Sequence, residues 1–200
     1  MDARNWPAYV LLGLIFAGSS FTEDSKGRTP LRFHSRSAHN MIIGDDGFKA
    51  FRKTNRAFGH TAALTIRTLE PGEVFEVFLE STEYVENPRI GVTTHSPDSI
   101  QYPDYMNHLR SGTWGWDVYP NEVYQDGEVI KEPYPAEERT IKRGDTFGVV
   151  VKPEGSLHFY HNGVDLGEAA NELFGKYYGY IDLYWGGSNA TIFNFEDFLQ

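Results

Sequence analysis

Short runs in which apolar and polar residues alternate recur along this chain, and they constrain its fold more than any other feature. In "EVFEVFLE", residues 73–80, Phe75, Val77 and Leu79 fall on one face of an extended strand, and glutamates fall on the other. The same period of two occurs in "TAALTIRTL" (61–69), "DTFGVVVK" (145–152) and "ATIFNFEDF" (190–198). This pattern predicts half-buried β-strands.

Turn-forming residues separate these runs. The turn signals are "EPGE" (70–73), "KRGD" (142–145), "KPEGS" (152–156) and "HNG" (161–163). After residue 30, no apolar stripe follows the helical period over several turns. Many short strands at close spacing predict an all-β fold, an antiparallel β-sandwich, with a barrel as the lesser alternative.

The stretch "EGSLHFYHNGVDLGEAA" (154–170) predicts a hairpin around Asn162-Gly163. An Asn-Gly loop favours a type I′ turn, because both of its residues need a positive φ. The expected cross-strand pairs are His161 with Val164, Tyr160 with Asp165, Phe159 with Leu166 and His158 with Gly167. We therefore expect structural roles for Phe159, Asn162, Gly163, Asp165 and Gly167. His158 and His161 are three residues apart and point to opposite faces, so they cannot chelate one metal ion.

Composition excludes several classes of function. The formal net charge is −10, which opposes binding to nucleic acid, and the chain has no cysteine. Disulfides, a cysteine nucleophile and the thiolate zinc site of a RING module are therefore excluded. The chain carries no glycine-rich phosphate loop, serine nucleophile elbow or zinc-binding helix motif. The glutamates around "ESTEYVE" (80–86) are better explained as solvated carboxylates than as a glycosidase pair. We expect no enzyme activity, no catalytic residue, no metal and no cofactor.

The N-terminal part differs from the rest in composition. "AYVLLGLIFAG" (8–18) is a continuous apolar run that fits the core of a signal peptide, with cleavage before Ser20. The alternative for residues 1–19 is a hydrophobic tail or a buried helix. Residues 20–30 read as a polar linker, and residues 31–200 as one domain. Cleavage would make the protein secreted and the Asn189-Ala190-Thr191 sequon usable for glycosylation, whereas an intact N-terminus predicts a cytoplasmic protein.

The stretch from Thr94 to Gly127 is rich in tyrosine and tryptophan among prolines, glycines and asparagines. Loops of this composition are typical of binding surfaces, because aromatic side chains provide contact area at a low entropic cost. We expect Tyr105, Trp116, Tyr119 and Tyr124 to bind a ligand, and we expect Trp116, Tyr105 and Tyr119 to be exposed. For Trp114, which a glycine follows, core packing is at least as favoured as binding.

Six stretches together resemble the Neuralized homology repeat (NHR) domain. The family pattern "DGSLHF-x-x-NG-x-D-x-G-x-A-A" reads "EGSLHFYHNGVDLGEAA" here. "GDTFGVVV", "RIGVTTHSP", "EPGEVFEVFL", "FHSRSAHNMII" and "YIDLY" resemble other family segments in the same order, over residues 31–195. The chain departs from the family at "SAHN", at "VENPR" and at "LYWGGSNATI", all in or beside predicted loops.

The resemblance implies a concanavalin/SPRY-like β-sandwich that recognises a protein or peptide. In Neuralized-type proteins this domain recruits substrates to a ubiquitin ligase whose activity lies in a separate RING or SOCS segment. The resemblance thus identifies a single-domain member without such a segment, acting as an adaptor for a separate ligase. Family members also contact phosphoinositides through basic residues near the domain start; here only Lys26, Arg28, Arg32 and Arg36 are available, and the net charge opposes such contact. The alternative function is a secreted carbohydrate-binding sandwich, suggested by the apolar leader and the aromatic residues.

Overall fold

The computed structural model describes residues 29–54, 59–80, 88–136, 141–142, 144–184 and 189–193. The chain divides into two units, Met1–Pro30 and Leu31–Gln200, and every described strand lies in the second unit. The strands form two sheets, and all strand pairs within the described residues are antiparallel. The predicted all-β antiparallel sandwich is confirmed.

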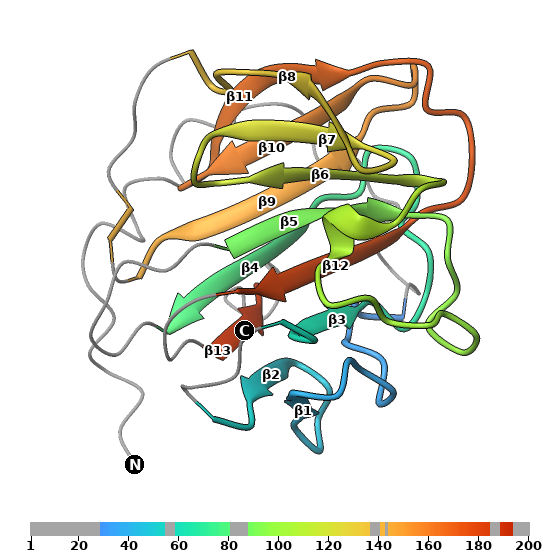
Figure 1. Ribbon diagram of the computed structural model, residues 1–200, viewed down its shortest axis with the longest axis vertical. Coiled ribbons are helices and arrows are strands. Elements are labelled where there is room, and N and C mark those ends of the chain that lie inside the picture. Colours follow the sequence, from blue (N-terminus) through green and yellow to red (C-terminus); the bar gives the residue numbers. More distant parts are fainter. Residues whose placement is uncertain are drawn as a thin grey trace. The chain divides into compact units, whose positions relative to one another are not determined.

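One sheet has seven strands in the spatial order β1-β2-β13-β4-β9-β10-β11 (Figure 1). Their bounds are β1 Met41–Ile43, β2 Lys49–Arg52, β4 Phe75–Glu80, β9 Thr146–Val151, β10 Leu157–His161, β11 Val164–Ala170 and β13 Asn189–Ile192.

The other sheet has six strands in the order β3-β12-β5-β6-β7-β8, and it is the nearer layer in Figure 1. Their bounds are β3 Ala62–Leu64, β5 Pro88–Thr93, β6 Thr113–Asp117, β7 Glu122–Gln125, β8 Glu128–Lys131 and β12 Tyr178–Leu183. A turn of 3₁₀ helix, η1 (Met106–His108), lies between β5 and β6. Across the described ranges, no helix has the length and apolar character needed to cross a membrane.

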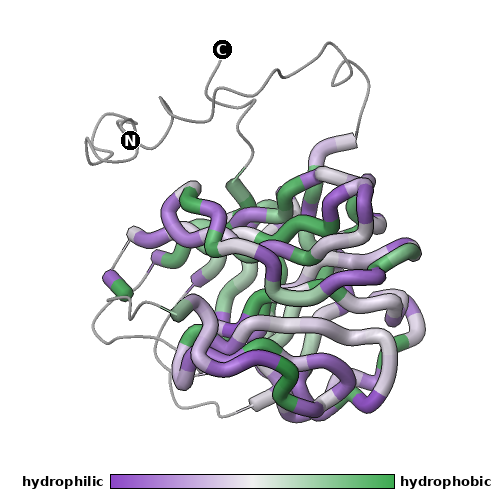
Figure 2. Tube along the Cα trace, turned by 90° about the horizontal axis from the view of Figure 1, so that it is seen from above, coloured by the Kyte–Doolittle hydropathy of each residue, from purple (hydrophilic) through white to green (hydrophobic). Residues whose placement is uncertain are grey.

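The main core lies between the inner faces of the two sheets. The alternation predicted for β4 is present, with Phe75, Val77 and Leu79 buried and the residues between them half-buried. Seen from above, hydrophobic and hydrophilic residues are interspersed along the trace (Figure 2). The centre of this core is aromatic: the Trp116 ring contacts those of Tyr134, Phe147 and Phe159 at centroid distances of 5.9–6.1 Å. Burial of such rings is a major source of stability in a sandwich.

The outer face of the six-stranded sheet is also covered, by residues 94–112, which connect β5 to β6. Ile100 and Met106 from this segment form a second apolar cluster with Leu64 and Tyr180. Tyr180 and Ile181 are neighbours in β12, so their side chains point to opposite faces of the sheet. Because Ile181 belongs to the main core, Tyr180 and the second cluster lie on the outer face. All six residues of β5 are buried as a result. We call residues 94–112 the covering segment.

Hydrogen bonds hold the covering segment to the sheet. Asp182 is fully buried, and its carboxylate accepts hydrogen bonds from the Thr61 hydroxyl at 2.8 Å and the Met106 N–H at 3.0 Å. The Arg36 guanidinium donates to the carbonyl oxygens of Pro97 and Ile100. These bonds satisfy polar groups that would otherwise be buried unpaired.

Tyr180 crosses a pair of glycines on the same outer face. It lies opposite Gly91, which lies opposite Gly115 on the next strand. A Cβ atom built on Gly91 would lie 2.6 Å from the Tyr180 hydroxyl oxygen, and one built on Gly115 would overlap it more severely. The absence of a side chain at both positions therefore makes room for the tyrosine ring.

The hairpin of β10 and β11 has the predicted turn but only part of the predicted register. Asn162 and Gly163 have φ values of 52° and 73°, as the type I′ turn requires, and the pairs nearest the turn are confirmed. Further along, His158 pairs with Glu168, so the predicted pairs of Phe159 with Leu166 and of His158 with Gly167 are wrong. The reason is a β-bulge at Gly167, where φ is 89°.

The Tyr134 hydroxyl bridges this bulge. It donates a hydrogen bond to the Gly167 carbonyl oxygen at 2.7 Å and accepts one from the Phe159 N–H at 3.4 Å. Because the bulge interrupts the ladder there, the side chain of a distant residue supplies the missing partners. Tyr134 is itself only 1% exposed.

Candidate functional site

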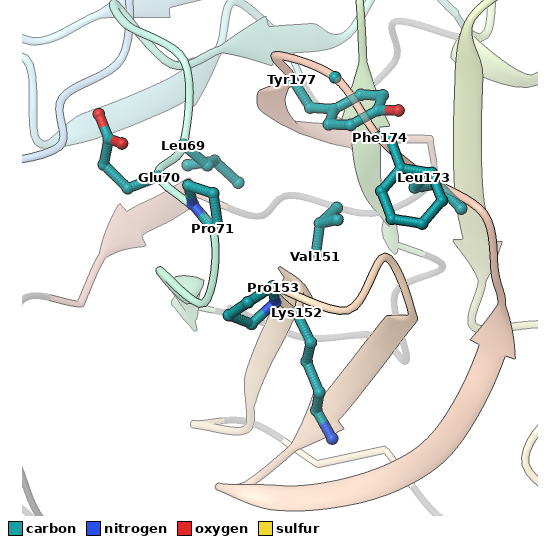
Figure 3. A pocket seen from close by; sticks show the side chains of 10 residues that line it. Leu69, Glu70, Pro71, Val151, Lys152, Pro153, Leu173, Phe174 and Tyr177 are labelled. Atoms are coloured by element: carbon teal, nitrogen blue, oxygen red, sulfur yellow. The ribbon is translucent and has the colours of Figure 1, made fainter.

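A pocket of about 230 Å³ lies at one end of the sandwich, between three loops. The loops are residues 65–74 between β3 and β4, residues 152–156 between β9 and β10, and residues 171–177 between β11 and β12. Its apolar lining consists of Leu69, Pro71, Val151, Pro153, Leu173, Phe174 and Tyr177. Figure 3 shows Leu69, Val151, Phe174 and Tyr177 around the hollow, while the charged ends of Glu70 and Lys152 extend away from it.

Backbone hydrogen bonds tie the three loops to one another and to the sheet. The Leu69 N–H donates to the Tyr177 carbonyl oxygen at 2.7 Å, and the Leu173 N–H donates to that of Gly155 at 2.9 Å. The Gly72 N–H donates to the Val151 carbonyl oxygen at 2.8 Å. The pocket is therefore preformed, which lowers the entropic cost of binding a ligand.

Phe174 is the most exposed large hydrophobic residue among those the structure describes. Its exposed fraction is 74%, whereas its neighbours Leu173 and Tyr177 are buried. A Cβ atom at Gly155 would lie 2.7 Å from the Phe174 ring, so the ring rests directly on the glycine backbone. One side of the ring is thus supported and the rest is open to solvent, the arrangement expected of an aromatic contact residue.

An aromatic contact and an ion pair stabilise the loops that form the pocket. The Tyr177 ring meets Trp114 edge to face at a centroid distance of 5.7 Å. Burial raises the pKa of Tyr177, so its hydroxyl stays protonated at neutral pH. On the loop that carries Leu69, Arg67 makes two hydrogen bonds to the Glu73 carboxylate at 2.6 and 2.7 Å, and this pairing raises the pKa of Arg67. The pocket thus presents an uncharged interior and a charged border.

The expectation that Trp116 is exposed is wrong. Its exposed fraction is 1%, because "TWGWD" (113–117) forms strand β6 rather than a loop, and both tryptophans lie on the inner face of that strand. Trp116 occupies the centre of the aromatic core, so it cannot contact a ligand in this conformation. Trp114 packs against the same core and is half-buried, as expected of a core residue.

The three tyrosines predicted to bind a ligand lie in different surroundings. Tyr119 is 72% exposed, as expected. Tyr105 is half-buried and stacks edge to face on Tyr184 at 4.9 Å, with the Arg89 guanidinium 5.1 Å from its ring. Tyr124 is half-buried and donates a hydrogen bond to Glu122 at 2.5 Å. Their role in ligand binding stays a prediction.

A row of charged residues runs straight across four strands beneath the covering segment. Asp182, Arg89, Asp117 and Glu122 are successive cross-strand partners. The Arg89 Nε donates to Asp117 Oδ2 at 2.7 Å, yet burial outweighs this pairing and raises the pKa of Asp117 to about 6. Burial also raises the pKa of Asp182, with Arg89 opposing the shift. The first three are buried, and two of them contact the covering segment: Asp182 accepts the Met106 N–H, and the Arg89 guanidinium lies over the Tyr105 ring.

Four residues of the predicted hairpin set make structural contacts, and the fifth, Gly163, has the positive φ of the turn. Phe159 is fully buried, and Asn162 donates to Asp145 Oδ1 at 2.9 Å. Asp165 accepts hydrogen bonds from His158 Nδ1 and from the Gly167 N–H, both at 2.8 Å. Burial alone would raise the pKa of Asp165, but these hydrogen bonds lower it.

The two histidines of the hairpin pair with different aspartates, in agreement with their opposite faces. His158 pairs with Asp165, and His161 Nε2 lies 2.8 Å from Asp145 Oδ2. Within the described ranges, no group of three or more histidine and carboxylate side chains is arranged to hold a metal ion.

Other predicted sites lie partly outside the described residues. Residues 1–28, with the leader and two of the four basic residues named for phosphoinositide contact, are outside them, as are Glu83 and Glu86. Arg36 is engaged by the covering segment, and Arg32 lies over the Phe48 ring at 4.4 Å. Asn189 begins the inner strand β13 and is half-buried. Glycosylation of Asn189 stays a prediction.

Sequence reasoning missed Phe174. Its segment "NELFGKYYGY" (171–180) places the phenylalanine after a leucine and before a glycine, in the turn just before β12. A large apolar residue in such a turn is the signal that could have found it.

The chain is similar to known proteins in both sequence and fold. The sequence model of the family described as Neuralized matches residues 33–193. The crystal structure of the Neuralized NHR1 domain of Drosophila melanogaster matches with a TM-score of 0.61 and 20% identity, over 84% of this chain and 99% of that chain. The solution structure of the NHR domain in Drosophila Neuralized matches with a TM-score of 0.59 and 21% identity, over 92% and 99%.

A SPRY domain has a similar fold. The SPRY domain of human HERC1 matches with a TM-score of 0.58 and 16% identity, over 82% of this chain and 98% of that chain. At these identities the structural likeness concerns the fold alone.

Proposed function

This chain belongs to the Neuralized family, and we propose that it is a non-catalytic module that recognises a segment of another protein. NHR and SPRY-like domains are protein-interaction modules, which supports this class of function in general terms. The finer assignment of a site depends on the geometry of this chain.

The observation that carries the proposal is Phe174, which is 74% exposed beside a preformed apolar pocket. A ring in this position adds apolar contact area at the mouth of a hollow whose interior is uncharged. An apolar side chain of a bound peptide enters this hollow and packs against Phe174, Val151 and Tyr177. Aromatic residues that become buried when a partner binds contribute much of the binding free energy of a typical interface.

The family resemblance supports a finer proposal, that the module is a substrate-recognition adaptor for a separate ubiquitin ligase. This role requires a cytoplasmic location, whereas a cleaved leader would export the protein and favour an extracellular partner. N-terminal sequencing of the mature protein, together with cell fractionation, tests the two locations. A mature protein that begins at Ser20 would overturn the adaptor role.

The pocket is tested by selecting peptides from a random display library against the full chain and measuring their affinities. We expect Phe174→Ala to weaken binding of the selected peptides about tenfold or more, because truncation of a central aromatic residue costs this much at many interfaces. Tyr119→Ala is the matched control, since Tyr119 is 72% exposed but lies outside the pocket. The Tyr119→Ala variant should bind the selected peptides as tightly as the unsubstituted chain does.

The converse result, binding lost with Tyr119→Ala and kept with Phe174→Ala, would move the site to the predicted aromatic residues and refute the pocket. A glycan array run in parallel tests the carbohydrate alternative. Saturable glycan binding without any peptide binding would refute the proposed function.

A further inference from the structure

Basic side chains beside the pocket are neutralised within the protein. Arg67 is paired with Glu73 through two hydrogen bonds. Lys152 Nζ lies 3.2 Å from Asp165 Oδ2. These pairs leave little positive charge at the border to attract an acidic ligand.

Each of the three loops that build the pocket also contributes an exposed carboxylate. Glu70 lies on the first loop, Glu154 on the second and Glu172 on the third, and all three are exposed. Lys176 is the one exposed basic residue on these loops, every residue of which the structure describes. The three loops therefore carry a net negative charge, in a chain whose formal net charge is −10.

We infer that the ligand of this pocket is a short basic segment of a partner protein, with one apolar side chain flanked by lysine or arginine. This inference rests on the proposed function. The apolar side chain enters the hollow, and the flanking cations face Glu70, Glu154 and Glu172. Exposed charge pairs of this kind add modest affinity each, and together they raise the rate of association at low ionic strength.

The test uses synthetic peptides that share a central leucine and differ only in the flanking residues, which are lysine, serine or glutamate. Dissociation constants for the full-length chain are measured by fluorescence anisotropy at low and high ionic strength. At low ionic strength we expect the lysine peptide to bind roughly tenfold more tightly than the serine peptide, and the glutamate peptide to bind most weakly. High ionic strength should remove most of this difference, because salt screens exposed charges.

Two charge-matched variants show whether the effect is local. The first carries Glu70→Gln, Glu154→Gln and Glu172→Gln at the pocket. The second carries Asp45→Asn, Glu128→Gln and Glu132→Gln, at exposed positions outside the three loops that form the pocket. We expect the first variant to lose the preference for lysine and the second to keep it. All six residues are exposed, and thermal unfolding checks that both variants fold.

The possible results separate this inference from the proposed function. If both variants lost the preference for lysine equally, the overall charge of the protein would attract the peptide, and the inference would be overturned. Phe174-dependent binding with no preference for lysine would overturn the inference and leave the proposed function standing. If neither these peptides nor the library-selected peptides bound in a Phe174-dependent way, the proposed pocket would fail, and the inference with it.

Discussion

Gly115→Ala tests the close packing of Tyr180 across the six-stranded sheet. The added methyl group would overlap the Tyr180 hydroxyl oxygen and lie 3.2 Å from Cζ of the same ring. Tyr180 is 1% exposed and packs beneath the covering segment, so its ring has little room to move. Overpacking of a rigid site typically costs 1–3 kcal/mol, and we expect about 3 kcal/mol of lost unfolding free energy here.

A double-mutant cycle with Tyr180→Phe isolates this clash. Removing the hydroxyl leaves Cζ at 3.2 Å as the nearest obstacle, which a shift of a few tenths of an ångström relieves. In that background Gly115→Ala should cost about 1 kcal/mol, so the coupling between the two substitutions should be about 2 kcal/mol. Urea denaturation of the four proteins, monitored by tryptophan fluorescence, measures each term.

Gly148→Ala is the control for adding a methyl group inside a strand. Its nearest contacts would be Tyr160 Cβ and Val74 Cγ1, both at 3.3 Å, so we expect a loss below about 1 kcal/mol. If Gly115→Ala cost the same in both Tyr180 backgrounds, the packing of the hydroxyl against this glycine would be refuted.

Three further predictions concern the hairpin and the buried charges, and urea denaturation measures all of them. Tyr134→Phe should cost about 1 kcal/mol, because it removes the hydrogen bond to the exposed Gly167 carbonyl oxygen and the one from the N–H of buried Phe159; a loss within error would refute the bridge. Gly163→Val should cost about 1–3 kcal/mol, because a β-branched residue resists the positive φ of the turn, and an unchanged midpoint would contradict this reasoning. In the folded state the pKa of Asp117 is raised from 3.8 to about 6. Between these pH values the folded state therefore binds more protons than the unfolded state. The contribution of Asp117 to stability therefore increases as the pH falls through this range, by about 3 kcal/mol in total. Asp117→Asn should remove this increase, and an unchanged pH profile would refute the assignment.

The hairpin shows how far local sequence determines structure. Asn162-Gly163 predicts the turn and the two nearest pairs, because a two-residue loop fixes the register next to it. The bulge at Gly167 was not predicted, since its bridging partner, Tyr134, comes from outside the hairpin. Local patterns thus determine the start of the pairing, and a long-range contact determines where it shifts.

Trp116 shows why the predicted binding surface was partly wrong. Thr113, Gly115 and Asp117 alternate with the two tryptophans, which is a strand pattern, but the glycines and prolines around it favour a loop. The pocket was missed for a different reason. Its three loops lie far apart in the sequence, and only the pairing of the strands brings them together.

The covering segment has a consequence for folding and for the design of shorter versions of this domain. Before residues 94–112 dock, the outer face of the six-stranded sheet presents Leu64 and Tyr180 to water, and Asp182 lacks its bond from Met106. Docking closes a contact between positions far apart in the chain, a slow type of step in folding. A version with this segment shortened, although it looks like a dispensable loop, would expose an apolar sheet face and be prone to aggregate.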